Sequence, residues 1–460
     1  MISEELVRQV ERHMGHVPTA EQHKAMRVFA EFMLDKEPQA VMVLRGSAGT
    51  GKTTLAAAVV RTLLGMRQKL VLMAPTGRAA KVFSLYASQP AYTIHRRIYR
   101  QKSAVGSMSF SLNDNLHTDT LFIVDEASMI SGEGLLDDLV RYVYGGRNCR
   151  MMLIGDTAQL PPVGEDVAAA LNGEVLRCYG LSVYETDLNE VLRQSRQSGI
   201  LWNATRIREY EDAAQTLLPR IKIKGFADIS IAPGDELIES LASSYSRVGT
   251  DETMVVTRSN KRCNIYNQGI RNTVLDREEE LSRGDRLMVV KNNYHWSANT
   301  PLPFIANGDH CVVQRVRNIR ELYGFRFADV TLQFPDYEDL DITATVLLDT
   351  LTSEAPALTA EQQNLLYEKV MEDYADIPLK ADRMGKLKAD PYFNALQVKY
   401  GYAVTCHKAQ GGQWAHIYID QGYMTDDMLT SDYFHWLSTA LTRATERVFL
   451  VNWPKAQVEE

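Results

Sequence analysis

The residues best suited to chemistry lie in one glycine-rich stretch: Gly46, Ser47, Ala48, Gly49, Thr50, Gly51, Lys52 and Thr53. They match the pattern G-x-x-x-x-G-K-[ST], in which the glycines let backbone N–H groups close around phosphate oxygens. Lys52 would reach the β- and γ-phosphates, the hydroxyl of Thr53 would bind Mg²⁺, and Thr54 would complete the phosphate site. The alternative is a glycine-rich turn with an incidental lysine. The match predicts a nucleotide site.

Two acidic residues, Asp125 and Glu126, follow the apolar run 121–124. A carboxylate at a strand end suits a hard Mg²⁺ ion, so Asp125 is the predicted metal ligand. Glu126 is placed to orient or deprotonate an attacking water. Taken alone, the pair would be read as a solvated strand end. Downstream of a phosphate-binding loop, it favours nucleotide hydrolysis.

A third polar group is Gln159, in the segment 155–164 that follows another apolar run. An amide at this position can hydrogen-bond a γ-phosphate or its attacking water, and can report hydrolysis to a neighbouring domain. A plain turn built on Asp, Pro and Gly is the alternative, and in isolation it is the better reading.

Strands and helices must alternate to position these groups. We expect strands at 40–45, 69–74, 120–125 and 150–155, and a helix at 52–64. This alternation predicts a parallel, doubly wound α/β sheet with its ligands at the carboxyl ends of the strands. A second α/β pattern has strands at 254–257, 417–420 and 447–451, and a helix at 432–443.

Two segments interrupt these patterns. Residues 107–112 alternate with period two, as one arm of a hairpin would. Segments 284–316 and 326–349 read as short strands, which predicts a small all-β insert. Thr359 then precedes a helix, with Gln362 as its capping-box partner.

With these motifs the chain resembles the superfamily 1 helicases of the 5′-to-3′ branch, which include bacterial RecD-like and phage Dda-like enzymes. The resemblance runs in order through nearly the whole chain, in APTGRAAK at 74–81, TIH at 93–95, DEASM at 125–129, GDTAQLPPVG at 155–164, EVLRQ at 190–194, TCHKAQG at 405–411 and TALTRA at 439–444. It implies two RecA-like cores, with a hairpin insert in the first and an SH3-like β-rich insert in the second.

The resemblance also implies domain bounds. The first core would cover 1–190 with a pin hairpin at 96–119. The second core would cover 191–283 and 391–460. The β-rich insert, with an acidic helical extension, would occupy 284–390.

Further roles at the nucleotide site come from the resemblance alone. Arg193 and Arg443 would be arginine fingers that reach the γ-phosphate from the second core, so that ATP closes the cleft between the cores. Gln22 would recognise adenine, although an exposed helical glutamine is the alternative. Gln410 and Gly411 would lie between the nucleotide and the DNA strand.

The resemblance implies contacts with single-stranded DNA from both cores. On the first core they are Pro75, Thr76, Arg78, Thr93 and His95, and on the second they are His407 and Lys408. Cations that track phosphates and groups that stack on bases suit such a strand. For both histidines, a satisfied structural role is the alternative.

The pin hairpin would carry an apolar wedge that splits the duplex. Met108 and Phe110 are the candidates, and the sequence does not choose between them. An inert hairpin is the alternative.

We therefore expect an ATP- and Mg²⁺-dependent DNA helicase that moves 5′-to-3′ and acts as a monomer on single-stranded DNA and at junctions with duplex. Only the resemblance favours DNA over RNA. An ATP-dependent binding switch is the competing class, against which the intact Lys52, Glu126, Arg193 and Arg443 argue.

The formal charge of −8 first argues against a polyanionic partner. Its distribution removes this objection, because residues 327–376 hold twelve acids against one lysine. Residues 75–105 hold six Lys and Arg and no acid, a local surplus of the kind that attracts phosphates. The acidic segment is read as a solvated face, or as a barrier that keeps DNA in its channel.

The sequence has no apolar run of transmembrane length, and its five cysteines contain no C-x-x-C pair. We expect a cytoplasmic protein with no membrane partner.

Overall fold

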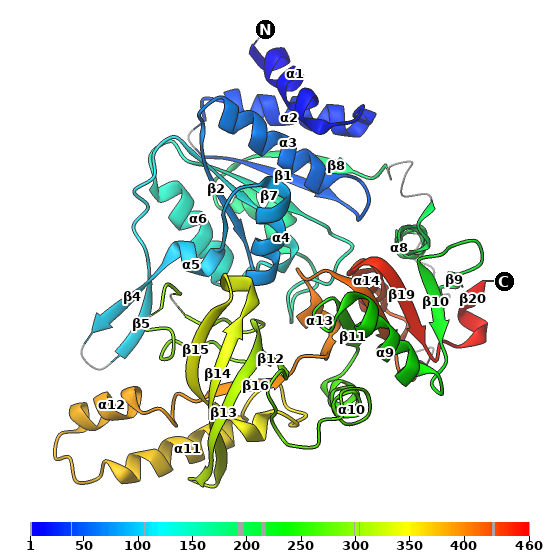
Figure 1. Ribbon diagram of the computed structural model, residues 1–460. Helices are drawn as coiled ribbons and strands as arrows, with labels where there is room; N and C mark the ends of the chain where they lie inside the picture. The colour runs from blue at the N-terminus through cyan, green and yellow to red at the C-terminus, as the bar shows by residue number, and fades with distance from the viewer. Residues whose placement is uncertain are drawn as a thin grey trace. The chain divides into compact units, whose positions relative to one another are not determined.

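The computed structural model describes residues 2–37, 39–104, 107–190, 197–212, 218–298, 300–302, 304–425 and 428–459 (Figure 1). The chain divides into two compact units. Unit 1 comprises Met1–Ile98, Leu112–Gly234 and Ala409–Glu460, and unit 2 comprises Tyr99–Ser111 and Asp235–Lys408.

Unit 1 contains a six-stranded, all-parallel sheet. In spatial order its strands are β3 (Ala91–Thr93), β2 (Lys69–Ala74), β6 (Thr120–Val124), β7 (Arg150–Gly155), β1 (Ala40–Gly46) and β8 (Ser182–Leu188). The four strands predicted here are confirmed to within one residue. The central strands are apolar and buried along nearly their whole length, as expected of a parallel sheet covered on both faces.

Helices α1 (Ile2–Met14), α2 (Ala20–Leu34) and α3 (Lys52–Gly65) share one apolar core with this sheet (Figure 1). Val10, Phe29 and Leu63 are among its buried side chains. The predicted helix at 52–64 is confirmed as α3. This part of the unit also contains α4 (Gly77–Ala87), α5 (Ile94–Ile98), α6 (Leu135–Gly145) and α7 (Gly173–Cys178).

A second set of parallel strands in unit 1 comprises β10 (Ile229–Ala232), β19 (Ala444–Val451) and β18 (Trp414–Asp420), paired in this order. Helix α14 (Ser431–Leu441) and helix α8 (Gly199–Asp212) pack together beside them. The strands expected at 417–420 and 447–451 and the helix expected at 432–443 are confirmed, although α14 ends two residues early.

Unit 2 holds the parallel pair β11 (Thr253–Thr257) and β17 (Ala403–Thr405), with helices α9 (Leu237–Val248) and α10 (Asn260–Gly269). It also holds a closed barrel of β12 (Arg286–Val289), β13 (His310–Leu322), β14 (Phe325–Phe334), β15 (Leu340–Leu347) and β16 (Leu396–Tyr400). The predicted β-rich insert is thus confirmed. The expectation of short strands is wrong for β13 and β14, which have 13 and 10 residues, because they pair along nearly their full length.

Helices α11 (Ala360–Asp373) and α12 (Lys380–Ala389) extend from the barrel. The predicted capping box is confirmed, since Thr359 and Gln362 exchange both hydrogen bonds at the start of α11. Most acids of the segment 327–376 are exposed, which supports their interpretation as a solvated face; the exposed acids are Glu338, Asp339, Asp341, Glu354, Glu361, Glu368, Glu372, Asp373 and Asp376.

The predicted hairpin is confirmed as β4 (Tyr99–Ala104) and β5 (Ser107–Leu112), which pair as a two-stranded sheet. The side chains of Met108 and Phe110 lie outside the described part of the chain. All five cysteines are free. Among the described residues, no helix combines the length and the apolar composition needed to cross a bilayer.

Candidate nucleotide site and nucleic-acid interface

A cavity of about 360 Å³ in unit 1 brings together most of the groups predicted to handle a nucleotide. It lies where β1, β6 and β7 end, as expected for ligands of a parallel sheet. Its lining includes most of the glycine-rich loop, both predicted carboxylates, the predicted sensor amide and one predicted arginine finger; among them are Ser47, Gly49, Lys52, Thr53, Thr54, Asp125, Glu126, Gln159, Gly411 and Arg443.

The loop geometry explains its glycines. Gly49 and Gly51 have φ of +79° and +83°, a conformation that residues with a side chain rarely adopt. A Cβ on Gly46 would come within 2.8 Å of the Leu188 carbonyl oxygen, so this position also needs glycine. Gly51 is the N-cap of α3 and makes no side-chain cap, which leaves the first N–H groups of this helix facing the loop.

Lys52 points its ammonium at the same loop. Nζ donates hydrogen bonds to the carbonyl oxygens of Gly46 and Ser47, the latter at 2.9 Å. The hydroxyl of Thr50 donates to the Ser47 carbonyl at 2.8 Å and fixes the turn between them. The loop therefore presents a cation and a helix N-terminus to one cavity, which suits a phosphate chain.

Gln22 is fully buried, so the alternative of an exposed helical glutamine is wrong. Its Oε1 accepts from the Thr19 N–H at 3.1 Å, which closes a capping box at the start of α2. Its Nε2 donates to the Thr50 carbonyl at 3.0 Å. Gln22 thus ties α2 to the phosphate loop, and its role toward adenine stays a prediction.

Asp125 and Glu126 directly follow the end of β6. Glu126 has φ of +52°, and its N–H donates to Oδ1 of Asp125 at 2.9 Å. Burial, reinforced by the negative charge of Glu126, raises the pKa of Asp125 to about 7. A cation beside Asp125 would lower this pKa and favour the ionised carboxylate.

Thr53 and Asp125 fit a magnesium ion chemically, because they place hard oxygen donors on one cavity. Mg²⁺ commonly takes only one or two protein ligands and completes its shell with water and phosphate oxygens. Across the described residues, no cluster of three or more His, Cys, Asp and Glu side chains offers a fuller cage.

Arg443 reaches the same cavity from just beyond the end of α14. It is 3% exposed, and its Nε donates to the Thr439 carbonyl at 3.1 Å. Nη1 lies 3.8 Å from Oε1 of Glu126. The structure therefore brings this predicted finger to the predicted catalytic carboxylate. The other predicted finger, Arg193, lies outside the described residues.

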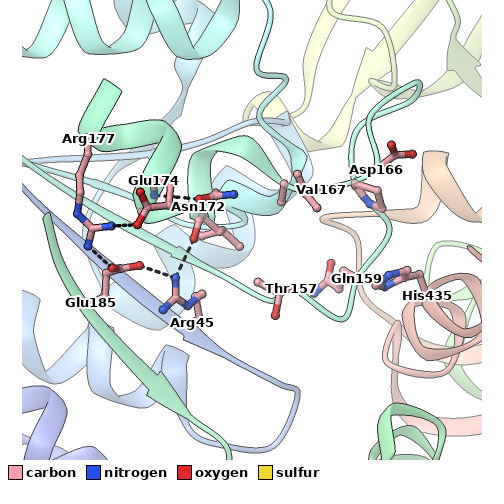
Figure 2. Close-up of a pocket in the computed structure, with 14 residues that line it drawn as sticks. Arg45, Thr157, Gln159, Asp166, Val167, Asn172, Glu174, Arg177, Glu185 and His435 are labelled. Atoms are coloured by element: carbon pink, nitrogen blue, oxygen red, sulfur yellow. Dashed lines mark hydrogen bonds and ion pairs between the residues drawn. The ribbon is translucent and has the colours of Figure 1, made fainter. Parts of the chain in front are cut away.

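Gln159 is 8% exposed, and its Oε1 has no hydrogen-bond partner among the described residues. It also lines a second cavity of about 440 Å³ (Figure 2). Gln410, predicted to lie between nucleotide and DNA, is buried and donates to the Leu160 carbonyl at 2.5 Å. Its neighbour Gly411 has φ of +71°, and a Cβ there would meet Oγ1 of Thr76 at 3.0 Å.

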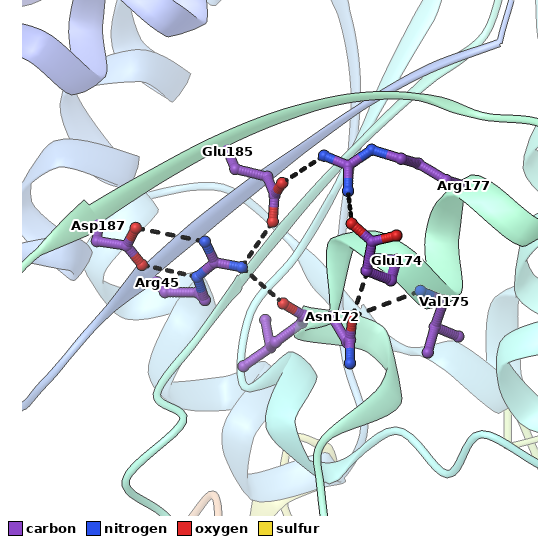
Figure 3. Close-up of polar contacts among 8 residues, drawn as sticks. Arg45, Asn172, Glu174, Val175, Arg177, Glu185 and Asp187 are labelled. Carbon is purple, nitrogen blue, oxygen red and sulfur yellow. Dashed lines mark hydrogen bonds and ion pairs between the residues drawn. The ribbon is translucent and has the colours of Figure 1, made fainter. Parts of the chain in front are cut away.

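The second cavity contains a residue that the sequence analysis missed. Arg45, which directly precedes Gly46, donates to Glu185 at 2.8 Å, to Asp187 at 2.7 and 3.3 Å, and to the Leu171 carbonyl at 3.0 Å (Figure 3). These contacts fasten the end of β1, where the phosphate loop begins, to β8. The only available signal was a charge at the end of an apolar strand.

The predicted DNA contacts of the first core have local structural roles. Thr76 caps α4 by accepting from the Ala79 N–H at 3.2 Å, and Thr93 accepts from the Arg96 N–H at 3.2 Å. Arg78 donates to the Gln413 carbonyl and lies 4.6 Å from the centre of the Trp414 ring.

Two other predicted contacts of this core lie close by. Pro75 is half-buried at the end of β2. Burial lowers the pKa of His95, which favours its neutral ring. Contacts of these five residues with DNA remain predictions.

In unit 2, His407 is exposed and Lys408 is half-buried, and both belong to the short helix α13 (Cys406–Ala409). Nζ of Lys408 donates to Oδ1 of Asn307 at 2.5 Å, in the turn between β12 and β13. Burial lowers the pKa of this lysine. The turn of the barrel and the predicted DNA-contact motif therefore adjoin each other in this unit.

Comparison with known families gives two matches in the order expected from these sites. Residues 18–223 match an AAA domain, and residues 400–451 match a UvrD-like helicase C-terminal domain. The first match contains the phosphate loop and both carboxylates, and the second contains Arg443.

Individual proteins that are similar to this chain have low sequence identity with it. The ATP-dependent RecD2 DNA helicase of Deinococcus radiodurans is 26% identical over 309 residues, which cover 64% of this chain and 40% of that protein. The ATP-dependent DNA helicase dda of Enterobacteria phage T4 is 24% identical over 270 residues, 55% of this chain and 57% of that protein. The crystal structure of Pif1 helicase from Bacteroides in complex with ADP-AlF3 and ssDNA is 14% identical, with 97% of this chain and 95% of that chain covered and a TM-score of 0.48.

Proposed function

Because this chain belongs among the superfamily 1 helicases related to RecD2 and Dda, we propose that it hydrolyses ATP to move along single-stranded DNA and to separate duplex DNA. The observation that carries the proposal is the single cavity lined by Lys52, Asp125, Glu126, Gln159 and Arg443. Each group suits one part of phosphoryl transfer to water.

In this proposal the phosphate loop and Lys52 hold the β- and γ-phosphates of ATP. Glu126 accepts a proton from a water whose oxygen attacks the γ-phosphorus, while the bond to the β,γ-bridging oxygen breaks and ADP leaves. Arg443, 3.8 Å from Glu126, lies where it would stabilise charge on the transferred group. Mg²⁺, when bound at Thr53 and Asp125, would neutralise phosphate charge.

The partner is proposed to be single-stranded DNA and its junctions with duplex, bound by the chain as a monomer that moves 5′-to-3′. Two observations support a nucleic-acid partner. The first is the run of cations without acids at 75–105, and the second is the exposed His407 beside the basic Lys408. Its similarity to RecD2 and Dda, both of them ATP-dependent DNA helicases, favours DNA.

The experiment that tests the proposal compares three otherwise identical duplexes with a 5′ single-stranded tail, a 3′ tail or blunt ends. We expect ATP-dependent strand separation from the 5′-tailed duplex only. Separation from the 3′ tail alone would refute the direction. ATP-dependent DNA binding without separation of any duplex would indicate a switch instead of a motor.

A further inference from the structure

The loop that carries Gln159 holds its shape with few bonds of its own. Within it, the Ala158 N–H donates to Oδ1 of Asp156 at 3.0 Å, and the Gln159 N–H donates to the Asp156 carbonyl at 3.3 Å. These bonds fix the first half of the turn. The orientation of the Gln159 side chain depends on what holds the residues on either side of it.

Side chains far away in the sequence hold both neighbours of Gln159. Nδ1 of His435 lies 3.1 Å from the Ala158 carbonyl oxygen. Oγ1 of Thr439 accepts from the Leu160 N–H at 3.0 Å, and Gln410 donates to the Leu160 carbonyl. Both backbone groups of Leu160 are therefore satisfied by side chains that lie between Ala409 and Glu460.

Two of these partners share one face of α14. His435 and Thr439 are four residues apart, so they point in the same direction from the helix. Arg443 follows four residues later, and its Nε donates to the carbonyl of Thr439. Thr439 thus contacts the sensor loop through its hydroxyl and the arginine finger through its backbone.

We propose that His435 and Thr439 are positioning residues, which set the Gln159 amide and the Arg443 guanidinium in register around the γ-phosphate. This inference rests on the proposed ATPase function. The carbonyl of Ala158 can only accept, so Nδ1 of His435 carries the proton in this contact. His435 also faces the second cavity, where Figure 2 shows it beside Gln159, so its ring is not enclosed on every side.

The chain offers matched substitutions for both contacts. His435→Leu keeps a branched side chain but removes the donor, whereas His435→Asn keeps an N–H donor two bonds from Cβ. Thr439→Val is isosteric and removes the hydroxyl, whereas Thr439→Ser retains it. Each of the four residues introduced has no more side-chain heavy atoms than the residue that it replaces.

The expected effect is on turnover and not on nucleotide affinity, because neither residue lines the nucleotide cavity. A buried N–H or carbonyl that loses its partner is unfavourable, so the loop that carries it should move. The resulting displacement of Gln159 should lower kcat about tenfold or more. We expect this loss for His435→Leu and Thr439→Val in the DNA-stimulated ATPase assay. The affinity for a fluorescent ADP analogue should change by less than about threefold, and the Asn and Ser variants should recover most of the turnover.

A double-substitution cycle tests whether the residues act through the sensor amide. If they do, adding His435→Leu or Thr439→Val to Gln159→Ala should reduce kcat little further than Gln159→Ala alone. A purely structural role would instead multiply the two losses, and that result would overturn the inference.

Hydrogen exchange provides a readout that needs no turnover. The peptide covering residues 155–164 should exchange faster in Thr439→Val than in the wild type or in Thr439→Ser, because the Leu160 N–H loses its acceptor. Absence of ATPase in the wild type would refute the proposed function while leaving this exchange test intact. Wild-type turnover in both His435→Leu and Thr439→Val, or unchanged exchange in Thr439→Val, would overturn the positioning role.

Discussion

Replacing Arg45 with methionine should weaken the attachment of β1 to β8 at the carboxyl end of β1, where the phosphate loop begins. Methionine keeps most of the unbranched chain but removes every hydrogen bond to Glu185, Asp187 and Leu171. The Asp187 side chain is 49% exposed, so its ion pair contributes under about 1 kcal/mol to stability.

The other two contacts contribute more to the free energy of unfolding. The Glu185 side chain is 25% exposed and accepts a charge-assisted bond at 2.8 Å, which contributes about 1.5 kcal/mol after allowance for its remaining partner, Arg177. The Leu171 carbonyl loses a bond worth about 1 kcal/mol. Together the losses amount to about 3 kcal/mol, a sizeable part of the 5–15 kcal/mol that holds a domain folded.

Arg177→Met is the matched control. It removes contacts to the same Glu185 and to Glu174, whose side chain is 85% exposed, so it should cost under about 1 kcal/mol. Hydrogen exchange of peptides covering β1 and β8, followed across a urea series, measures the local unfolding free energy of both variants. Equal losses in the two variants, or a loss below about 1 kcal/mol for Arg45→Met, would refute the assignment of Arg45 as the stronger anchor.

Four further predictions concern the site and its surroundings. Lys52→Ala should abolish ATP turnover, and normal turnover in that variant would exclude the phosphate site. Glu126→Gln should stop hydrolysis with little change in ADP affinity by fluorescence titration, whereas lost binding would indicate a structural role. Arg443→Ala should reduce kcat by about 10³ or more with an unchanged circular dichroism spectrum. Burial opposes ionisation of Glu185, but hydrogen bonds from Arg45 and Arg177 lower its pKa below the ordinary value of 4.5 overall. The stability that the ionised Glu185 contributes should therefore be present above pH 4.5 and be lost as the pH falls through its lowered pKa. Hydrogen exchange measured against pH should show a smaller loss in Arg45→Met.

Local pattern made the nucleotide site largely predictable. The phosphate loop, its preceding strand and its following helix are contiguous in sequence, so residue type and apolar periodicity were sufficient to locate them. The same holds for Asp125 and Glu126, which directly follow a buried strand.

What escaped prediction depends on partners distant in sequence. Nothing near Gln22 indicates that its amide would be buried against Thr50. The partners of Arg45 lie some 140 positions away, and the hydroxyl that holds Leu160 comes from Thr439, 279 positions away. Strand lengths in the barrel were also missed, because pairing across β13 and β14 sets them and local composition does not.

The cavity takes its lining from residues as far apart as Ser47 and Arg443. During synthesis, the first sheet can form while the residues that complete the site are still unmade, since domains tend to fold from the N-terminus onward. A chain released early, before Gln410 and Arg443, would retain its phosphate loop but lack the groups that hold Gln159 and reach Glu126. Under the proposed function, we expect such a fragment to bind nucleotide but to hydrolyse it slowly.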